Sequence, residues 1–406
     1  MKKSQGSNAI NKLFLVYCYV ILITVKSIFS QEVLTGIDVI EANNFVTLDN
    51  QKIGLITNHT GVNKNWKSTI DILHEASQVQ LIAIFTPEHG LRGKSTGKIA
   101  SEVDQSTGVP IYSLYGDVKR PTTTMLKNIQ TLVFDIQDIG SRYYTYIGTM
   151  KNCMIAASNN NINFIVLDRP NPINGIDIEG PVLKQKKTFE LAGIHSLPIR
   201  HGMTIGELAL MFNKEDKLGL ELEVIKMKGW KRSMWFDETN LPWINPSPNI
   251  RSLSQAILYS GIGLLERLNV NNKRGLDRPF EMFGAPWINS VELANHLNNR
   301  DIGGVKFMPI QFISPQGIYA NKKCEGVAIN LINRDSLETV SCSIKIIKTV
   351  TKLYPDSLEI NKLWHLLRSE EVRNSIKNKL PASKIIKNWS SELNEFKNRR
   401  KQYLLY

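Results

Sequence analysis

Four short polar segments of the sequence hold the side chains best placed to do chemistry, and each of them directly follows a short apolar run. The segments are 58–61 (NHTG), 87–90 (PEHG), 135–138 (DIQD) and 168–171 (DRPN). Together they supply carboxylates, imidazoles, amides and a guanidinium. If the apolar runs are strands of one parallel sheet, these segments meet at its carboxyl edge, where ligands bind in open α/β folds.

Glu88 is the strongest candidate for acid–base chemistry. A carboxylic acid at a strand end can protonate a leaving oxygen when its surroundings keep it protonated near neutral pH. The alternative interpretation is a turn carboxylate paired with Arg92. Glycoside hydrolysis normally uses two carboxylates, so Asp135, Asp138 or Asp168 is a possible partner, although aspartates at strand ends also cap helices.

Phenols and guanidinium groups surround these acids. The segment 142–146 (RYYTY) follows Asp138, and tyrosine can stack on a sugar, donate a proton or act as a nucleophile, or simply pack in a helix. Arg169, Arg200 and Arg274 lie in expected loops, where one of them would suit the carboxylate of an acidic sugar; surface ion pairs are the alternative. His89, His195 and His201 lack the short spacing of metal ligands, so we expect no metal and no cofactor.

The elements that must position these residues are predicted from hydrophobic patterns. Runs at 52–57, 79–85, 131–134 and 163–167 are short, apolar on both faces and rich in Val and Ile, as in a covered parallel sheet. Helical spacing occurs at 66–76, 121–128 and 142–159, which predicts a Rossmann-like, doubly wound domain over 31–200. A smaller α/β domain is expected over 201–406, with helices at 204–213 and 253–265 and strands near 220–226, 305–312 and 324–332.

The first thirty residues have the pattern of a secretory signal. Lysines precede an apolar run at 13–25, which Lys26 closes before the length of a membrane span. We therefore expect a signal peptide over 1–30 and an exported, periplasmic or extracellular protein without a stable membrane span, the alternative being an uncleaved anchor. The cysteines at 153, 324 and 342 are too few for a disulfide framework, and buried thiols are expected.

The formal net charge is +13, and four of the lysines lie in the leader. Such a charge favours association with anionic polymers without specifying which one. Only 397–401 (KNRRK) is a basic run. A solvated helix end explains it at least as well as a nucleic-acid arm, and no nucleic-acid partner is expected.

Several long motifs resemble one family. The segments 52–76 (KIGLITNHTGVNKNWKSTIDILHEA), 85–93 (FTPEHGLRG), 134–150 (FDIQDIGSRYYTYIGTM), 166–183 (VLDRPNPINGIDIEGPVL), 198–209 (PIRHGMTIGELA) and 277–287 (DRPFEMFGAPW) closely resemble the NamZ-type exo-β-N-acetylmuramidases, long known as a domain of unknown function. The resemblance runs from about residue 34 to the C-terminus.

This resemblance implies an active-site cleft between the two domains and release of N-acetylmuramic acid from the non-reducing end of peptidoglycan fragments. It also implies a catalytic glutamate, which falls on Glu88, and a catalytic tyrosine, for which Tyr144 and Tyr115 are candidates. We expect Glu88, Tyr144 and Asp138 to be catalytic. The residues expected to bind substrate are Asn58, His89, Tyr115, Asp135, Gln137, Arg142, Asp168, Arg169, Asn171, Arg200, His201 and Arg274.

Two segments depart from the family pattern. Residues 94–98 (KSTGK) replace a loop of Asp, Ala, Gly and Glu, and 271–276 (NNKRGL) replaces a glycine-rich stretch. These departures keep a non-catalytic muropeptide-binding protein open as an alternative. An esterase or amidase acting on wall material is disfavoured because the sequence has neither a G-x-S-x-G elbow nor an H-E-x-x-H zinc helix.

Overall fold

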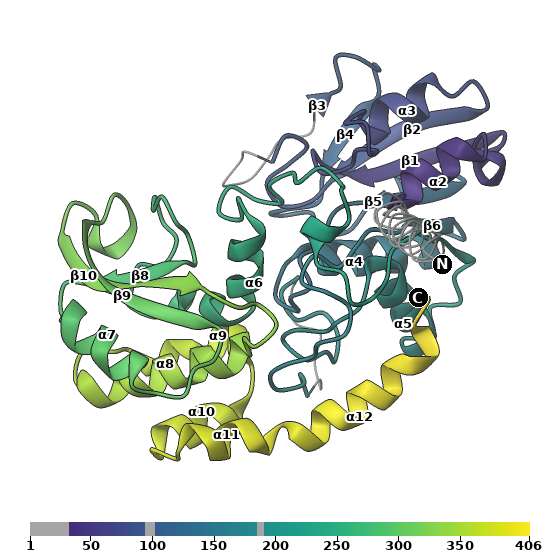
Figure 1. Cartoon of the computed structure of the whole chain (residues 1–406). Coiled ribbons are helices and arrows are strands. Elements are labelled where there is room, and N and C mark those ends of the chain that lie inside the picture. The colour runs from purple at the N-terminus through teal and green to yellow at the C-terminus, as the bar shows by residue number, and fades with distance from the viewer. Residues whose placement is uncertain (1–31, 94–101, 185–190) are drawn as a thin grey trace, which may run out of the picture.

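The structure, a computed structural model, describes residues 32–93, 102–184 and 191–406. The expected signal peptide at 1–30 and the loop at 94–98 lie outside the described residues. Figure 1 shows a larger α/β domain at the upper right and a smaller domain at the left, joined along the lower edge by the last helix.

The larger domain is built on a seven-stranded sheet with the order β3-β4-β2-β1-β5-β6-β7. The strands are β1 (Gln51–Thr57), β2 (Val79–Thr86), β3 (Glu102–Val103), β4 (Pro110–Ser113), β5 (Thr131–Asp135), β6 (Asn163–Leu167) and β7 (Leu222–Ile225). All neighbours are parallel except β3 and β4. Because β2 and β5 lie on opposite sides of β1, the chain reverses direction across the sheet there, which places a ligand crevice at the carboxyl edge.

Helices cover both faces of this sheet. Helices α2 (Gly36–Ala42) and α3 (Thr69–Glu75) pack on one face, and α4 (Tyr146–Asn159) and α5 (Ile205–Glu215) pack on the other. Leu55 and Val133 belong to the first core, whereas their chain neighbours Ile56 and Phe134 belong to the second. Burial of both faces explains the unbroken apolar runs, and it confirms the predicted doubly wound sheet.

The two domains meet later in the chain than predicted. We expected the boundary near 200, but β7 pairs with β6 in the first sheet, and α5 packs against both of these strands. Two predicted helices also differ in the structure. Residues 121–128 form turns in place of a helix. The helix predicted over 142–159 begins later, at Tyr146, because the backbone N–H of Arg142 donates to the carbonyl of Ile199.

The smaller domain contains an antiparallel sheet with the order β8-β10-β9. Its strands are β8 (Met282–Ala285), β9 (Val305–Ile313) and β10 (Lys323–Leu331), and its helices are α6 (Leu253–Ile262), α7 (Ser290–Asn298), α8 (Thr339–Leu353), α9 (Trp364–Leu367), α10 (Glu370–Lys377), α11 (Ala382–Asn388) and α12 (Ser390–Arg400). The predicted strands near 305–312 and 324–332 are confirmed. Helices α7 and α8 pack against each other, and α7 also packs against β9 and β10.

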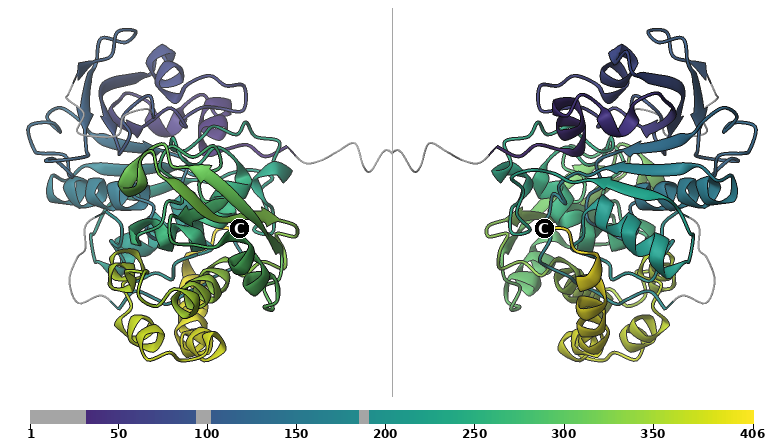
Figure 2. Two further views of the ribbon diagram at one scale, coloured as in Figure 1. Left: turned by 90° about the vertical axis from the view of Figure 1, so that its left-hand side faces the viewer. Right: turned by 90° about the vertical axis from the view of Figure 1, so that its right-hand side faces the viewer.

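The C-terminus returns to the larger domain. Helix α12 crosses the molecule and ends beside α5, as Figures 1 and 2 show. There the Tyr406 hydroxyl donates to Oδ2 of Asp168 and accepts from the N–H of Met227, both at 2.8 Å. The Arg400 guanidinium is buried against the carbonyls of 175, 176, 201 and 202. The basic run at 397–401 thus includes a residue that holds the domains together.

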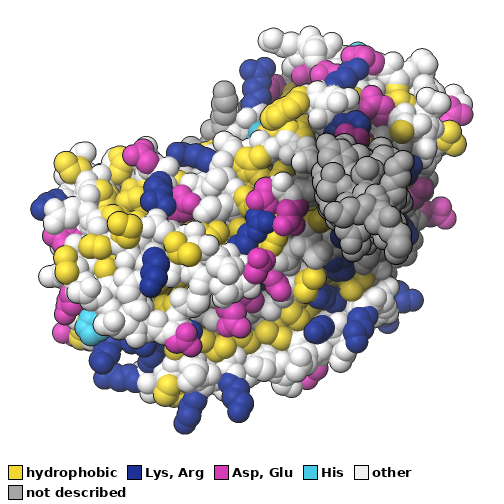
Figure 3. Space-filling model, viewed as in Figure 1, with side chains coloured by type: hydrophobic (Ala, Val, Ile, Leu, Met, Phe, Trp, Pro, Cys, Tyr) yellow, Lys and Arg dark blue, Asp and Glu magenta, His cyan; other side chains and the backbone are white. Residues whose placement is uncertain are grey.

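Basic side chains gather along the lower edge of the molecule, over α10, α11 and α12 (Figure 3). Cys153, Cys324 and Cys342 are buried free thiols, as predicted. Within the described parts of the chain, no helix has the length and apolar character needed to cross a bilayer.

Candidate active site

A cavity of about 600 Å³ lies between the two domains, at the carboxyl edge of the large sheet. Its walls hold the ends of strands β2 and β4 from the larger domain, and residues around α6, β8 and α9 from the smaller one. Of the predicted site residues, Glu88, His89, Tyr115 and Tyr144 line this cavity. The structure therefore brings together the candidate acid and both candidate tyrosines.

Glu88 reaches the cavity from a tight turn. The Gly90 N–H donates to the Pro87 carbonyl at 3.0 Å, and His89 adopts a left-handed backbone with φ 73°. A non-glycine residue in that region stores strain, which is typical of functional sites. The Thr145 hydroxyl donates to Oε2 of Glu88 at 2.7 Å, whereas Oε1 makes no hydrogen bond with another described residue. The predicted pairing of Glu88 with Arg92 does not occur: Arg92 lies on a neighbouring cavity.

Buried phenols form much of the cavity wall. Tyr143, Tyr144 and Tyr259 line it, and the ring of Tyr259 contacts each of the other two edge-on. Burial raises the pKa of Tyr144 and Tyr259 well above the usual value, and the Glu88 carboxylate adds to the effect on Tyr259. These phenols are therefore protonated at neutral pH.

The smaller domain contributes a second carboxylate and most of the cations. Glu266 lines the cavity and forms an ion pair with Lys273. Arg267 is exposed in the wall and forms no ion pair or side-chain hydrogen bond with another described residue. Further basic side chains come from Lys119, His365 and Arg368. The cavity can thus hold an anionic ligand close to two carboxyl groups.

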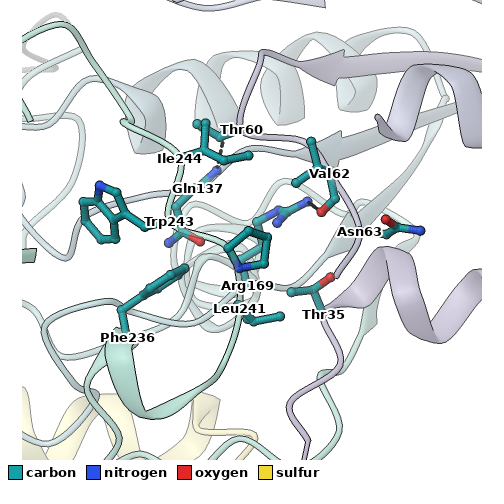
Figure 4. Close-up of a pocket in the computed structure, with 11 residues that line it drawn as sticks. Thr35, Thr60, Val62, Asn63, Gln137, Arg169, Phe236, Leu241, Trp243 and Ile244 are labelled. Atoms are coloured by element: carbon teal, nitrogen blue, oxygen red, sulfur yellow. Dashed lines mark hydrogen bonds between the residues drawn. The ribbon is translucent and has the colours of Figure 1, made fainter. Parts of the chain in front are cut away.

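Asp135, Arg169 and Gln137 do not line this cavity, contrary to prediction. Asp135 is fully buried and forms a two-pronged ion pair with Arg169, at 2.5 and 2.9 Å. Gln137 donates to the carbonyls of Asp138 and Pro170. Figure 4 shows Arg169 and Gln137 on a separate cavity of about 20 Å³, which Phe236 and Trp243 help to close. That volume suits about one water and no sugar.

Asp168, Asn171 and Asn58, which were predicted to bind substrate, do not line this cavity and make hydrogen bonds within the protein. Asp168 accepts from the hydroxyls of Thr204 and Tyr406 and from the Gly206 N–H, which fixes the start of α5. The Asn171 side chain donates to the Met203 carbonyl, and Asn58 caps its own turn by accepting from Thr60. The helix-cap alternative considered for Asp168 is the correct one.

The other three arginines that were predicted to bind substrate also lie outside the cavity. Arg142 is buried and donates to four backbone carbonyls, those of Pro181, Leu197, Leu366 and Leu367, which ties the larger domain to α9. Arg200 is buried in ion pairs with Asp177 and Glu179. Arg274 is exposed and does not line the cavity, although its neighbour Lys273 does.

Asp138 and His201 lie behind the cavity wall. Oδ2 of Asp138 accepts from the Gly140 N–H at 2.7 Å and is 3.4 Å from Nε2 of His201, which is fully buried. Asp138 helps to raise the pKa of Tyr146 and Tyr259. It can influence the site through these phenols but does not itself line the cavity.

Several lining residues were missed from the sequence, above all Thr145, Glu266, Arg267 and Lys273. Thr145 follows Tyr144 directly, so its place in the RYYTY segment was the available signal. Glu266 and Arg267 follow α6 in a segment with no recognisable motif. Among the described residues, no group of three or more His, Cys, Asp or Glu side chains is arranged to hold a metal.

Comparisons with known proteins agree with this geometry. Residues 53–254 match the family model described as exo-β-N-acetylmuramidase NamZ, N-terminal, and residues 257–406 match the model of its C-terminal part. The chain is 43% identical over 380 residues to the peptidoglycan β-N-acetylmuramidase NamZ of Bacillus subtilis, and the match covers 92% of both proteins.

Two solved structures of DUF1343 family proteins from Bacteroides fragilis are similar. The first has a TM-score of 0.86 and 38% identity, and the match covers 92% of this chain and 99% of that one. The second has a TM-score of 0.75 and 31% identity, with 93% and 99% covered. The two family models meet after β7, in agreement with the sheet. The chain described here therefore belongs to the NamZ family of exo-β-N-acetylmuramidases.

Proposed function

We propose that this protein is an exo-acting glycoside hydrolase that releases N-acetylmuramic acid from the non-reducing end of peptidoglycan fragments. The observation that carries the proposal is the position of Glu88, which the Thr145 hydroxyl holds at the wall of a cavity with basic side chains. Membership of the NamZ family, with a relative of B. subtilis named as a peptidoglycan β-N-acetylmuramidase, supports the same activity.

Glu88 acts as the general acid in this proposal. Thr145 occupies Oε2, so Oε1 is the oxygen that would carry a proton to the glycosidic oxygen. Protonation of the leaving oxygen is required because an alkoxide of a sugar is a poor leaving group.

Tyr144 acts as a hydrogen-bond donor. Burial raises its pKa well above the usual value, which disfavours the phenolate that a nucleophilic role would need. Its hydroxyl is buried and makes no well-formed hydrogen bond within the described structure, so in this proposal a bound sugar reaches it by displacing part of the cavity wall.

Glu266 replaces Asp138 as the proposed second carboxylate. It lines the cavity and forms an ion pair with Lys273. A charged carboxylate there can stabilise the positive charge that develops on the sugar, or orient water.

The basic side chains in the cavity wall suit an acidic sugar. N-acetylmuramic acid differs from N-acetylglucosamine by a lactyl group with a carboxylate. Arg267, which has no other partner among the described residues, is the proposed ligand of that carboxylate, and Lys119 and Arg368 add positive potential. Arg267 therefore takes the place of Arg169, Arg200 and Arg274, which the sequence offered as candidates to bind this carboxylate.

We also propose that the protein is exported, on the strength of its N-terminal sequence. Wall fragments are present outside the cytoplasmic membrane, so an exported enzyme would meet its substrate. Mass spectrometry of the protein recovered from the periplasm or the medium would give the mature N-terminus, and recovery of intact protein from the cytoplasm would contradict the proposal.

The activity is tested with two chromogenic substrates, a β-N-acetylmuramic acid glycoside and its β-N-acetylglucosamine counterpart. The proposal predicts turnover of the first and little of the second, together with free N-acetylmuramic acid as the product. Equal turnover of both would refute it. Binding without turnover would select the muropeptide-binding alternative, and release of a peptide or an acyl group in place of the monosaccharide would select the amidase or esterase.

A further inference from the structure

A second cavity, of about 480 Å³, opens next to the active-site cavity. Its walls include the indoles of Trp66 and Trp243 together with His59, Arg92, Asn245 and Pro248, and we call these six residues the tryptophan groove. None of them was predicted from the sequence to bind substrate.

Two chain segments run from the active-site cavity to the tryptophan groove. The turn after β2 places Glu88 and His89 in the first cavity and Arg92 in the second. The loop before α6 does the same, because Ser247 lines both cavities. A ligand that emerges from the active-site cavity between these segments passes directly into the groove.

Trp66 is presented to this groove by a rigid turn. Its side chain is 64% exposed, and its backbone is left-handed with φ 68°. The Asn63 side chain holds the turn by accepting from the N–H groups of 65 and 67, both at 3.0 Å, and by donating to Glu41. A large exposed indole in a strained backbone lowers stability and solubility, and such a feature is typical of a binding site.

The chemistry of the groove suits a sugar. Indole rings offer flat apolar faces against which the apolar face of a pyranose can pack, and they lose little entropy on binding. Nε2 of His59 is hydrogen-bonded to the carbonyl of Asn245 at 2.7 Å, and burial lowers the His59 pKa, which favours the neutral ring. Arg92 is exposed and can hydrogen-bond to hydroxyl or amide oxygens at the edge of the groove.

We propose that the tryptophan groove binds the leaving part of the substrate, the saccharide on the reducing-end side of the cleaved bond. The proposal rests on the proposed function, because it takes the sugar beside Glu88 as the terminal one. The carboxylates and most of the cations lie in the active-site cavity and the indoles lie in the groove, which divides the acidic terminal sugar from the neutral N-acetylglucosamine that follows it. The groove thereby sets a preference for saccharide chains over short glycosides.

Isothermal titration calorimetry with N,N′-diacetylchitobiose, a neutral β-linked disaccharide, tests this inference without requiring turnover. The full mature chain should bind it, and Trp66→Asn should weaken binding about tenfold, as expected for a central aromatic contact. Asn tolerates the left-handed backbone, so this variant should unfold at the same or a higher temperature. Trp66→Phe should retain most of the affinity, and Ile318→Ala, which alters an equally exposed side chain in the other domain, should change nothing.

The second part of the test is the same titration with free N-acetylmuramic acid. Its affinity should be unchanged in Trp66→Asn, because that sugar occupies the active-site cavity. Unchanged affinity for chitobiose in Trp66→Asn would overturn the proposal, and so would a concentration-dependent dimer that Trp66→Asn abolishes, since a second copy would then occupy the groove. If chitobiose binding depends on Trp66 but no muramic acid glycoside is cleaved, the tryptophan groove is a saccharide-binding site and the proposed activity is wrong.

Discussion

The Thr145 hydroxyl donates a hydrogen bond of 2.7 Å to Oε2 of Glu88, which joins the turn after β2 to the residue that precedes α4. The two residues are 57 positions apart in the chain, and the strands that lead to them, β2 and β5, lie on opposite sides of β1. The parallel sheet therefore brings the candidate acid to the residue that orients it.

Replacing Thr145 by Val should reduce kcat/KM about tenfold or more. The variant keeps the shape of the side chain but removes the hydrogen bond that orients Glu88, and a small misplacement of a catalytic group can cost roughly 10²-fold in rate. Thr145→Ser, which restores the hydroxyl, should recover most of the activity. If the Val and Ser variants have equal activity, Thr145 does not orient Glu88.

Replacing Arg267 by Gln should raise KM about tenfold for substrates with a lactyl carboxylate and leave kcat nearly unchanged. The reason is that a guanidinium holding a group remote from the reacting bond contributes equally to the ground state and the transition state. Arg274→Gln is the matched control, because Arg274 is exposed nearby but does not line the cavity. Steady-state kinetics that show the same KM for both variants would contradict the assignment.

Replacing Asp168 by Asn should flatten the dependence of stability on pH. Burial raises the pKa of Asp168 to about 7. A raised pKa means that the folded state binds the proton more tightly, so this contribution is present at acid pH and is lost as the pH rises from about 4 to about 7. Urea unfolding of the wild type should show a loss of at most about 1.4 kcal/mol per pH unit in this window. The same slope in Asp168→Asn would show that other groups cause it.

Replacing Arg142 by Met should destabilise the protein and also lower activity. The substitution leaves four buried carbonyls without their donor, at a cost of several kcal/mol. Two of these carbonyls belong to α9, which contains His365 of the cavity wall and is followed directly by Arg368. Thermal unfolding and kcat/KM should therefore both fall, whereas an unchanged unfolding temperature would show that the Arg142 contacts contribute little.

The sheet could be predicted from the sequence because both of its faces are covered. Leu55 and Ile56 face opposite cores, so β1 is apolar throughout, and its pattern needs no knowledge of the rest of the chain. The same is true of β5, where Val133 and Phe134 divide in this way. Strand β7 was predicted as a strand but assigned to the smaller domain, because its sequence does not show that it pairs with β6 in the larger sheet.

The roles of the strand-end residues could be predicted only in part. The long motif around Glu88 singled this residue out, and the structure places it in the cavity wall. Asp168 and Arg142 could not be interpreted correctly, because their partners come from distant parts of the chain: Tyr406 lies 238 positions from Asp168, and Leu367 lies 225 positions from Arg142. The sequence therefore shows which polar residues lie at the edge of the sheet. Which of them face the cavity depends on segments from distant parts of the chain that cover this edge.

The most direct test of the role of Glu88 is to measure how the loss of kcat/KM in Glu88→Gln depends on the leaving group of the substrate. If Glu88 is the general acid, the variant should lose roughly 10²–10⁴-fold in kcat/KM on a disaccharide with a terminal N-acetylmuramic acid. It should lose much less on the 2,4-dinitrophenyl glycoside of the same sugar, whose leaving group needs no proton. Equal losses on the two substrates, or wild-type activity on the disaccharide, would contradict the central claim.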